Sequence, residues 1–98
     1  MVELDESNFA EKTSEGVVVV DFYAPWCAPC RALSPILEKI ENANVYKVNV
    51  DDSPELSTKF NVYSIPLVVF MKDGVEVERV VGLQSQEAIQ NKVDLLNE

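Results

Sequence analysis

The sequence contains no histidine and only two cysteines among its 98 residues. A closed structural zinc site normally needs four ligands, so a metal here would require a second protomer or unusual carboxylate ligands. Glycine is also scarce, with three residues and no glycine-rich phosphate loop, which argues against a bound nucleotide or flavin. We therefore expect neither a metal site nor a tightly held cofactor.

Basic residues are few, because 8 lysines and arginines stand against 17 acidic residues and give a formal net charge of -9. Nucleic acids and anionic membranes both bind basic surfaces, so neither is expected as a partner. No apolar run reaches the roughly 20 residues that span a bilayer. The amino end also lacks the basic and then apolar stretch of a secretory signal, so we expect a cytoplasmic protein.

Length and composition favour one domain. Ninety-eight residues with 47% hydrophobic content suffice for a single core. At this size, roughly 60 to 70% of the surface of the unfolded chain is buried on folding. No linker, internal repeat or low-complexity stretch divides the chain. We predict that residues 1–98 form a single domain.

Four apolar segments rich in β-branched residues predict strands. They cover residues 17–23, 45–50, 65–71 and 75–81. The tripeptide Lys72-Asp73-Gly74 separates the last two as a tight hairpin signal, so these two strands should be antiparallel. Gly82 is expected to end the final strand.

Helical spacing of apolar residues predicts two helices in the first half of the chain. The first is short, carries Phe9, is capped by Asp5 or Ser7 and stops at Gly16. The second follows the first strand and ends near residues 42–44. Because Pro35 lacks an amide donor and lies inside this second helix, we predict a kink there.

Two further helices are predicted in the second half. A short one has Pro54 at its first position, where an amide would be unpaired anyway. The last one is capped by Ser85 and turns Ile89, Val93 and Leu96 inward. The order of elements implies parallel early strands joined by crossover helices and a terminal antiparallel hairpin. The predicted fold is a three-layer α/β sandwich, with a mixed sheet of four to five strands and helices on both faces.

The two cysteines are separated by two residues, in Trp26-Cys27-Ala28-Pro29-Cys30. This segment lies where an apolar strand gives way to a helix, so both sulfurs should lie on one face of the first helical turn. The unpaired amides of that turn favour the thiolate of Cys27. A structural staple or half of a zinc site would use the same spacing, but closing so short a loop stabilises the fold by only about 2 kcal/mol. A redox pair is the favoured interpretation.

Asp21 lies within an apolar strand that we expect helices to cover on both faces. Burial raises the pKa of a carboxyl group, so Asp21 would exchange protons near neutral pH. The alternative is an aspartate at a strand end that reaches water.

Several motifs together resemble the thioredoxin family, in order and in spacing, over essentially the whole chain. The most specific combination is Trp-Cys-x-Pro-Cys followed about 35 residues later by an Ile-Pro pair. The motifs are Val20-Asp21-Phe22-Tyr23-Ala24-Pro25-Trp26-Cys27-Ala28-Pro29-Cys30, Lys47-Val48-Asn49-Val50-Asp51, Ser64-Ile65-Pro66 and Lys72-Asp73-Gly74. The resemblance implies a thioredoxin-like fold and a dithiol–disulfide oxidoreductase that reduces protein disulfides.

The resemblance also implies roles for residues around the cysteine pair. Asp21 would carry the proton of the second cysteine, and Lys47 would lie nearby, although Lys47 alone is equally well interpreted as a surface charge. Pro29 matches the reducing members of the superfamily, since isomerase-type domains carry histidine there.

The implied substrate groove has four further residues. Pro66 would be cis, face the disulfide and keep metal away from the sulfurs. The backbone of Ile65 would pair with an extended substrate segment. Trp26 would form an apolar rim, or else be a plain core aromatic, and Gly82 would let substrate approach from the opposite side.

Three residues depart from the family pattern. Ala28 stands where thioredoxins usually have glycine, Tyr23 where many have tryptophan, and Leu67 where threonine commonly follows the proline. The dipeptide between the cysteines tunes redox poise in this superfamily, so the reduction potential is the property that these departures affect most directly.

The predicted function is reduction of disulfides in client proteins by a monomer, with electrons supplied by a reductase partner. Two alternatives remain at this point. One is a disulfide oxidase or isomerase with the same fold. The other is a binding subunit that uses the fold as a surface and never cycles its thiols.

Overall fold

The computed structural model describes residues 1–98, and its centre is a five-stranded sheet with strand order β1-β3-β2-β4-β5. The strands are β1 (Val2–Leu4), β2 (Val17–Tyr23), β3 (Asn44–Asn49), β4 (Leu67–Lys72) and β5 (Val75–Val81). Strands β1, β3 and β2 run parallel to one another, whereas β4 is antiparallel to β2 and β5 is antiparallel to β4. The predicted mixed sheet is confirmed.

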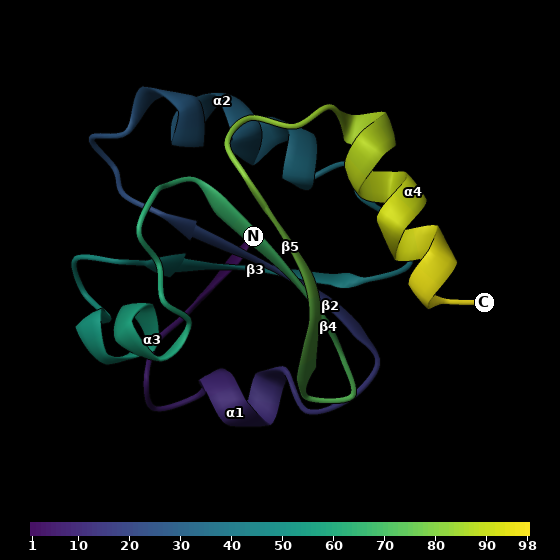
Figure 1. The fold of residues 1–98 in the computed structure, drawn as a ribbon, viewed down its shortest axis with the longest axis horizontal. Helices are drawn as coiled ribbons and strands as arrows, with labels where there is room; N and C mark the ends of the chain where they lie inside the picture. Colours follow the sequence, from purple (N-terminus) through teal and green to yellow (C-terminus); the bar gives the residue numbers. More distant parts are fainter.

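Four helices cover the two faces of this sheet (Figure 1). They are α1 (Phe9–Lys12), α2 (Ala28–Leu37), α3 (Pro54–Lys59) and α4 (Gln86–Leu96). Figure 1 shows α2 and α4 together on one side of the sheet and α1 and α3 on the other. The fold is therefore the predicted three-layer α/β sandwich. No helix combines the length and the apolar character needed to cross a membrane.

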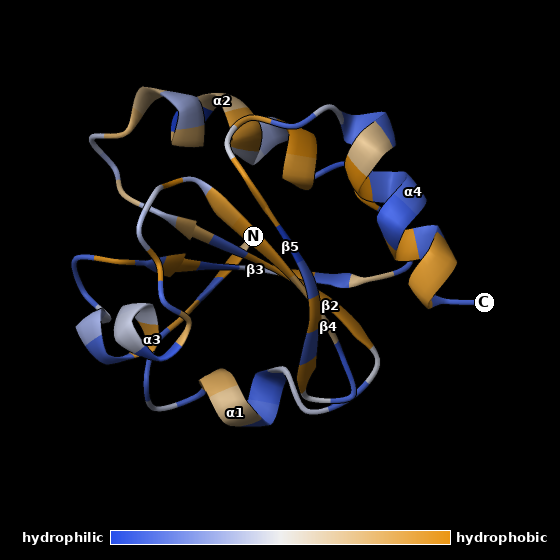
Figure 2. Ribbon diagram, in the orientation of Figure 1, coloured by the Kyte–Doolittle hydropathy of each residue, from blue (hydrophilic) through white to orange (hydrophobic).

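The sheet contributes to a separate hydrophobic cluster on each face, because successive side chains of a strand point to opposite faces. Strand β2 supplies Val18, Val20 and Phe22 to the cluster beneath α1 and α3, and Val17 and Val19 to the cluster beneath α2 and α4. All seven residues of β2 except Tyr23 are buried. The apolar colouring of the central strands in Figure 2 follows from this double coverage.

Strand β1 is the element that the sequence did not predict. It has three residues, of which Leu4 is buried and Val2 is 58% exposed, so no alternating pattern could develop. Its conformation is set by parallel pairing with β3. This pairing brings residues at the amino end of the chain next to the functional site described below.

The predicted ends of several elements were wrong. Helix α1 begins after Asn8 and not after Asp5 or Ser7, and it ends at Lys12, well before Gly16. The Asp5 side chain instead accepts a bond from the backbone amide of Ser7, which forms a local turn.

Helix α2 ends at Leu37 and not near residues 42–44. The amides of Lys39 and Ile40 bond to carbonyls three residues earlier, so the chain leaves the α-helix through tighter turns while Ile40 stays buried. That buried Ile40 extended the apparent helical pattern. Pro35 does lie inside the helix, and the kink at Pro35 stays a prediction.

Strand β4 begins at Leu67 and not at residue 65, since Pro66 has no amide to donate to the ladder. The predicted strand 45–50 is displaced by one residue, to Asn44–Asn49. Strands β2 and β5, the start of α3 at Pro54 and the capping of α4 by Ser85 match the predictions. The hairpin between β4 and β5 also forms as predicted, with Asp73 and Gly74 at positive φ.

Candidate functional site

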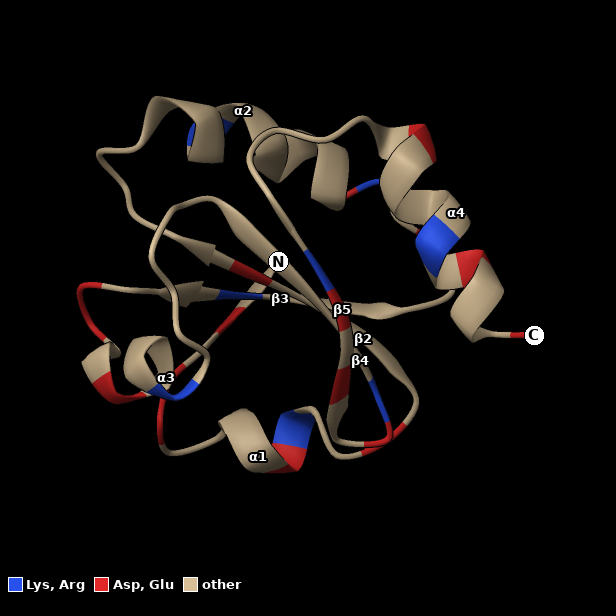
Figure 3. Cartoon of the chain, in the orientation of Figure 1, with Lys and Arg blue, Asp and Glu red and all other residues tan.

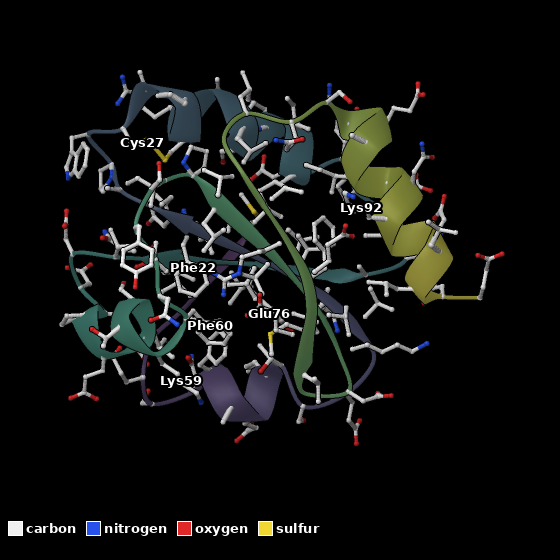
Figure 4. All side chains as sticks on the ribbon, viewed as in Figure 1. Phe22, Cys27, Lys59, Phe60, Glu76 and Lys92 are labelled. Carbon is white, nitrogen blue, oxygen red and sulfur yellow. A yellow bond between two sulfur atoms is a disulfide. The ribbon has the colours of Figure 1, made fainter.

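Cys27 and Cys30 form a disulfide bond at the start of α2, with their Cα atoms 5.3 Å apart (Figure 4). Cys27 is the N-cap residue of this helix, and its Sγ accepts a bond from the Cys30 amide at 3.3 Å. The sulfur therefore lies against the positive end of the helix dipole, which stabilises a thiolate after reduction. Both cysteines are buried, with 6% of Cys27 and 2% of Cys30 exposed.

The two residues between the cysteines occupy the first helical turn. Ala28 and Pro29 are the first two residues of α2, and both are exposed. Amides in the first turn have no partner within the helix, so Pro29 fits there without loss of a hydrogen bond. The substitution of alanine for the usual glycine at position 28 is compatible with helical backbone angles.

Asp21 lies in β2 beneath α2 and is 2% exposed. Its Oδ1 atom has no hydrogen-bond partner. Burial raises the pKa of Asp21 to about 7, and the nearby charge of Lys47 partly offsets this effect. The alternative of an aspartate that reaches water at a strand end is therefore wrong.

A cavity of about 240 Å³ connects Asp21 with the redox pair. Its lining includes Asp21, Tyr23, Cys30 and Lys47 from the strands and α2, together with Arg31 and Ser34 of the same helix. Lys47 is half-buried, and its Nζ lies 5.3 Å from the centre of the Tyr23 ring. Lys47 is thus part of the site and not merely a surface charge.

The loop before β4 closes the other side of the disulfide. The Ile65–Pro66 peptide bond is cis, as the family resemblance implied. Cys27 Sγ lies 3.9 Å from the carbonyl oxygen of Ile65. The carbonyl oxygen of Pro66 accepts a bond of 2.8 Å from the Gly82 amide, which joins this loop to the end of β5.

Trp26 is exposed and lies immediately before the redox pair. The residue is 69% exposed, and its Nε1 donates a hydrogen bond of 2.9 Å to Oδ2 of Asp51. The core-aromatic alternative for Trp26 is therefore wrong. Gly82 has φ of +91°, and a Cβ added there would have no neighbour within 4 Å, so there is open space beside the backbone at this point.

The remaining departures from the family pattern have different surroundings. Leu67 is 2% exposed and packs in the cluster beneath α1 and α3, so its side chain belongs to the hydrophobic core. Tyr23 lines the cavity, and its hydroxyl donates a hydrogen bond to Oε1 of Glu3. Burial and this hydrogen bond raise the pKa of Tyr23, so the hydroxyl stays protonated.

Two residues of the site were missed from the sequence. Asp51 ends one of the motifs shared with the family but was assigned no role, and its bond to Trp26 depends on how the loop after β3 folds. Glu3 lies outside every motif in the sequence and was not predicted to belong to the site. The register of β1 against β3 places Glu3 opposite Lys47, and a prediction of β1 would have been needed to find this.

Comparison with known proteins points to one family. The sequence pattern of the family described as thioredoxin matches residues 1–95. Thioredoxin from Bacillus subtilis (strain 168) is 39% identical over 99 residues, which cover 96% of this chain and 95% of that protein. Thioredoxin from Chlamydia muridarum is 40% identical over 90 residues, with 88% of each chain covered.

A solved structure supports the same assignment. A mutant thioredoxin from Halobacterium salinarum superposes with a TM-score of 0.92 and 32% identity, covering 99% of this chain and 90% of that chain. The fold, the sequence and the disulfide-forming cysteine pair thus all indicate the same family. The chain belongs to the thioredoxin family and is a dithiol–disulfide oxidoreductase, a protein-disulfide reductase whose redox centre is the Cys27–Cys30 pair.

Proposed function

We propose that Cys27 is the attacking cysteine in the reduction of client disulfides. Its thiolate attacks one sulfur of the client, the disulfide of the client breaks, and the leaving sulfur departs with the electron pair and is protonated. A mixed disulfide then joins Cys27 to the client. The position of Cys27 Sγ at the start of α2, where it accepts the Cys30 amide, is the observation that carries this assignment.

Cys30 then resolves the mixed disulfide. Its thiol gives a proton to the ionised Asp21 carboxylate, and the resulting thiolate forms a bond to Cys27 Sγ. The bond between Cys27 and the client breaks, and the second client sulfur leaves as a thiolate. Two electrons have passed from the Cys27/Cys30 dithiol to the client. The shared cavity and the raised pKa of Asp21, about 7, support this role, with Lys47 as its charged neighbour.

Substrate would bind across the loop that carries Ile65 and Pro66. An extended client segment pairs with the Ile65 backbone, Trp26 forms an apolar rim, and Gly82 leaves room on the opposite side. The exposure of Trp26 and the open backbone at Gly82 support this arrangement. Pro66 shapes the groove beside Cys27.

The clients are disulfide-containing proteins, and a thioredoxin-reductase-type donor returns the electrons, as the family implies in general. We propose that residues 1–98 act as one domain, as a monomer and in the cytoplasm. No cofactor other than the cysteine pair takes part, and neither metal, nucleic acid nor membrane is a partner. The charge of -9 supports the last two assignments.

Trapping of the mixed disulfide tests the roles of the two cysteines. The Cys30→Ser variant keeps the nucleophile and loses the resolving thiol, so it should accumulate covalent mixed disulfides with a model client such as insulin. The Cys27→Ser variant should trap none. Equal trapping by both variants, or by neither, would show that the roles are wrongly assigned.

A further inference from the structure

Three charged residues lie in register across β1, β3 and β2. Glu3 pairs with Lys47, and Lys47 pairs with Asp21. Residues in register on neighbouring strands point to the same face, which here is the face covered by α2. Figure 3 shows the basic segment of β3 beside an acidic segment of β2. Lys47 therefore lies between two carboxyl groups, one buried and one exposed.

Lys47 forms an ion pair with neither of these groups. The three ion pairs of the structure join Glu38 to the amino terminus, Arg79 to Glu76 and Lys92 to Glu78. The Glu3 carboxylate instead accepts the Tyr23 hydroxyl, and the Lys47 ammonium lies over the Tyr23 ring. Tyr23 thus contacts Glu3 through its hydroxyl and Lys47 through its ring face, where a cation is attracted.

We propose that Glu3 and Tyr23 are positioning residues for the Lys47 ammonium. The hydrogen bond between them holds the Glu3 carboxylate on the Tyr23 hydroxyl, so the ammonium stays over the Tyr23 ring beside Asp21. Without the hydroxyl, the Glu3 carboxylate would compete with Asp21 for the Lys47 ammonium, because Glu3 lies opposite Lys47 on the neighbouring strand and the lysine side chain is flexible. The positive charge would then move from the buried carboxyl toward the edge of the sheet. The inference rests on the proposed role of Asp21 and names residues that act through it.

The groups that face Asp21 define what else affects its titration. Lys47 faces it from β3, Tyr23 lies two residues further along β2, and Cys30 and Arg31 line the same cavity from α2. Glu3 reaches the group through Tyr23. Of these, Arg31 is held by a bond of 2.8 Å to the Pro25 carbonyl oxygen, so its position does not depend on Glu3 or Tyr23. In the oxidised protein neither cysteine titrates.

The Tyr23→Phe variant tests the proposal, because it removes the hydroxyl and keeps the ring. Carboxyl-carbon NMR of the oxidised protein measures the titration midpoint of Asp21 directly. An opposite charge lowers a carboxyl pKa by roughly 1 to 3 units, so partial withdrawal of Lys47 should raise the midpoint by roughly one pH unit. An unchanged or lowered midpoint would overturn the proposal.

Two double variants identify the cause of the shift. In the Glu3→Gln background the competing Glu3 carboxylate is absent, so Tyr23→Phe should leave the midpoint unchanged. In the Lys47→Gln background the cation is absent, and Tyr23→Phe should again have no effect. A shift that persists in either background contradicts the proposal. Tyr46→Phe removes a hydroxyl from the opposite face of β3 and should leave the midpoint of Asp21 unchanged.

The functional consequence is measured separately. An aromatic disulfide that releases one coloured thiolate on attack by Cys27 and a second on resolution by Cys30 reports the two steps in succession. In Tyr23→Phe the second phase should shift to higher pH with the NMR midpoint, while the first phase is unchanged. If the NMR shift occurs without a change in the second phase, the positioning of Lys47 stands and the role of Asp21 in resolution is wrong.

Discussion

The carboxyl group of Asp21 is buried beneath a helix, and its Oδ1 atom has no hydrogen-bond partner. Its ionisation therefore affects the stability of the fold. Burial raises its pKa from 3.8 to about 7, which means that the folded state binds a proton more tightly than the unfolded state. Below the unfolded pKa, Asp21 is protonated in both states, and no stability is lost through its ionisation. As the pH rises above the unfolded pKa, the unfolded state releases this proton while the folded state keeps it, so stability is lost until the pH has passed through the folded pKa.

The Asp21→Asn variant should therefore become more stable than the wild-type protein as the pH rises. Below about pH 4 both proteins carry a neutral group at position 21, and their free energies of unfolding should nearly match. Above about pH 8 the variant should be more stable by roughly 4 kcal/mol, the value expected for a shift of this size at about 1.36 kcal/mol per pKa unit. Denaturant unfolding of the oxidised proteins across this range measures the difference. A constant difference at all pH values would mean that Asp21 titrates normally in the folded state.

At the residue scale the sequence predicted the cysteine pair and the buried Asp21, and the resemblance to the thioredoxin family implied the cis proline and the exposed Trp26, because each lies in a contiguous motif. It did not predict the contact of Tyr23 with Glu3, which joins residues 20 positions apart. Nor did it predict the bond between Trp26 and Asp51, which spans 25 positions. Such contacts follow from strand register and loop folding, neither of which a local pattern contains.

At the scale of secondary-structure elements, the start of a helix depends on whether its capping side chain forms a bond. Ser85 caps α4, and its Oγ accepts the Ala88 amide at 3.1 Å. Ser53 occupies the same position at the start of α3, but its Oγ is buried without any partner. The two serines form a matched pair that separates the effect of the cap bond from the effect of the residue type.

Replacement of each serine by alanine should therefore have different effects. Ser85→Ala loses a cap bond and should lower the free energy of unfolding by about 1 kcal/mol. Ser53→Ala removes a buried hydroxyl without a partner, so it should leave stability unchanged or raise it by up to about 1 kcal/mol. Denaturant unfolding of both variants measures the difference. Equal losses at the two positions would show that Ser53 also contributes a bond in solution.

The elements with long apolar runs or clear turn residues were predicted well, and those formed by pairing were not. The predicted bounds of β2 were correct because its apolar residues are nearly continuous. Those of β5 were correct because Asp73-Gly74 precedes the strand and Gly82 follows it. Strand β1 was missed because three residues give no period. The end of α2 was placed too late because Ile40 remains buried after the α-helix has ended.

For the whole molecule, folding and the redox state of the cysteine pair are coupled. The disulfide closes a short loop between residues that are already held 5.3 Å apart at Cα by the first turn of α2. Closure of a loop of about four residues removes conformational entropy from the unfolded chain equivalent to about 2 kcal/mol. The fold should therefore favour the disulfide by a similar amount.

The oxidised protein should accordingly be more stable than the reduced protein by about 2 kcal/mol. Guanidinium unfolding of the two forms, with the reduced form kept under excess dithiol, measures this difference. The difference also affects the potential, since about 1.4 kcal/mol corresponds to 30 mV for a two-electron couple. A reduced form more stable than the oxidised form would instead be the property of a disulfide oxidant.

The reduction potential of the Cys27/Cys30 pair tests the central assignment most directly. The protein is equilibrated against redox buffers, its free thiols are alkylated, and the oxidised and reduced fractions are read by mass. A protein-disulfide reductase of this family should have a potential near about -270 mV, with a modest displacement attributable to Ala28. A potential between about -180 and -120 mV, which is typical of isomerases and oxidases, would contradict the assignment. So would failure of the pair to form a disulfide.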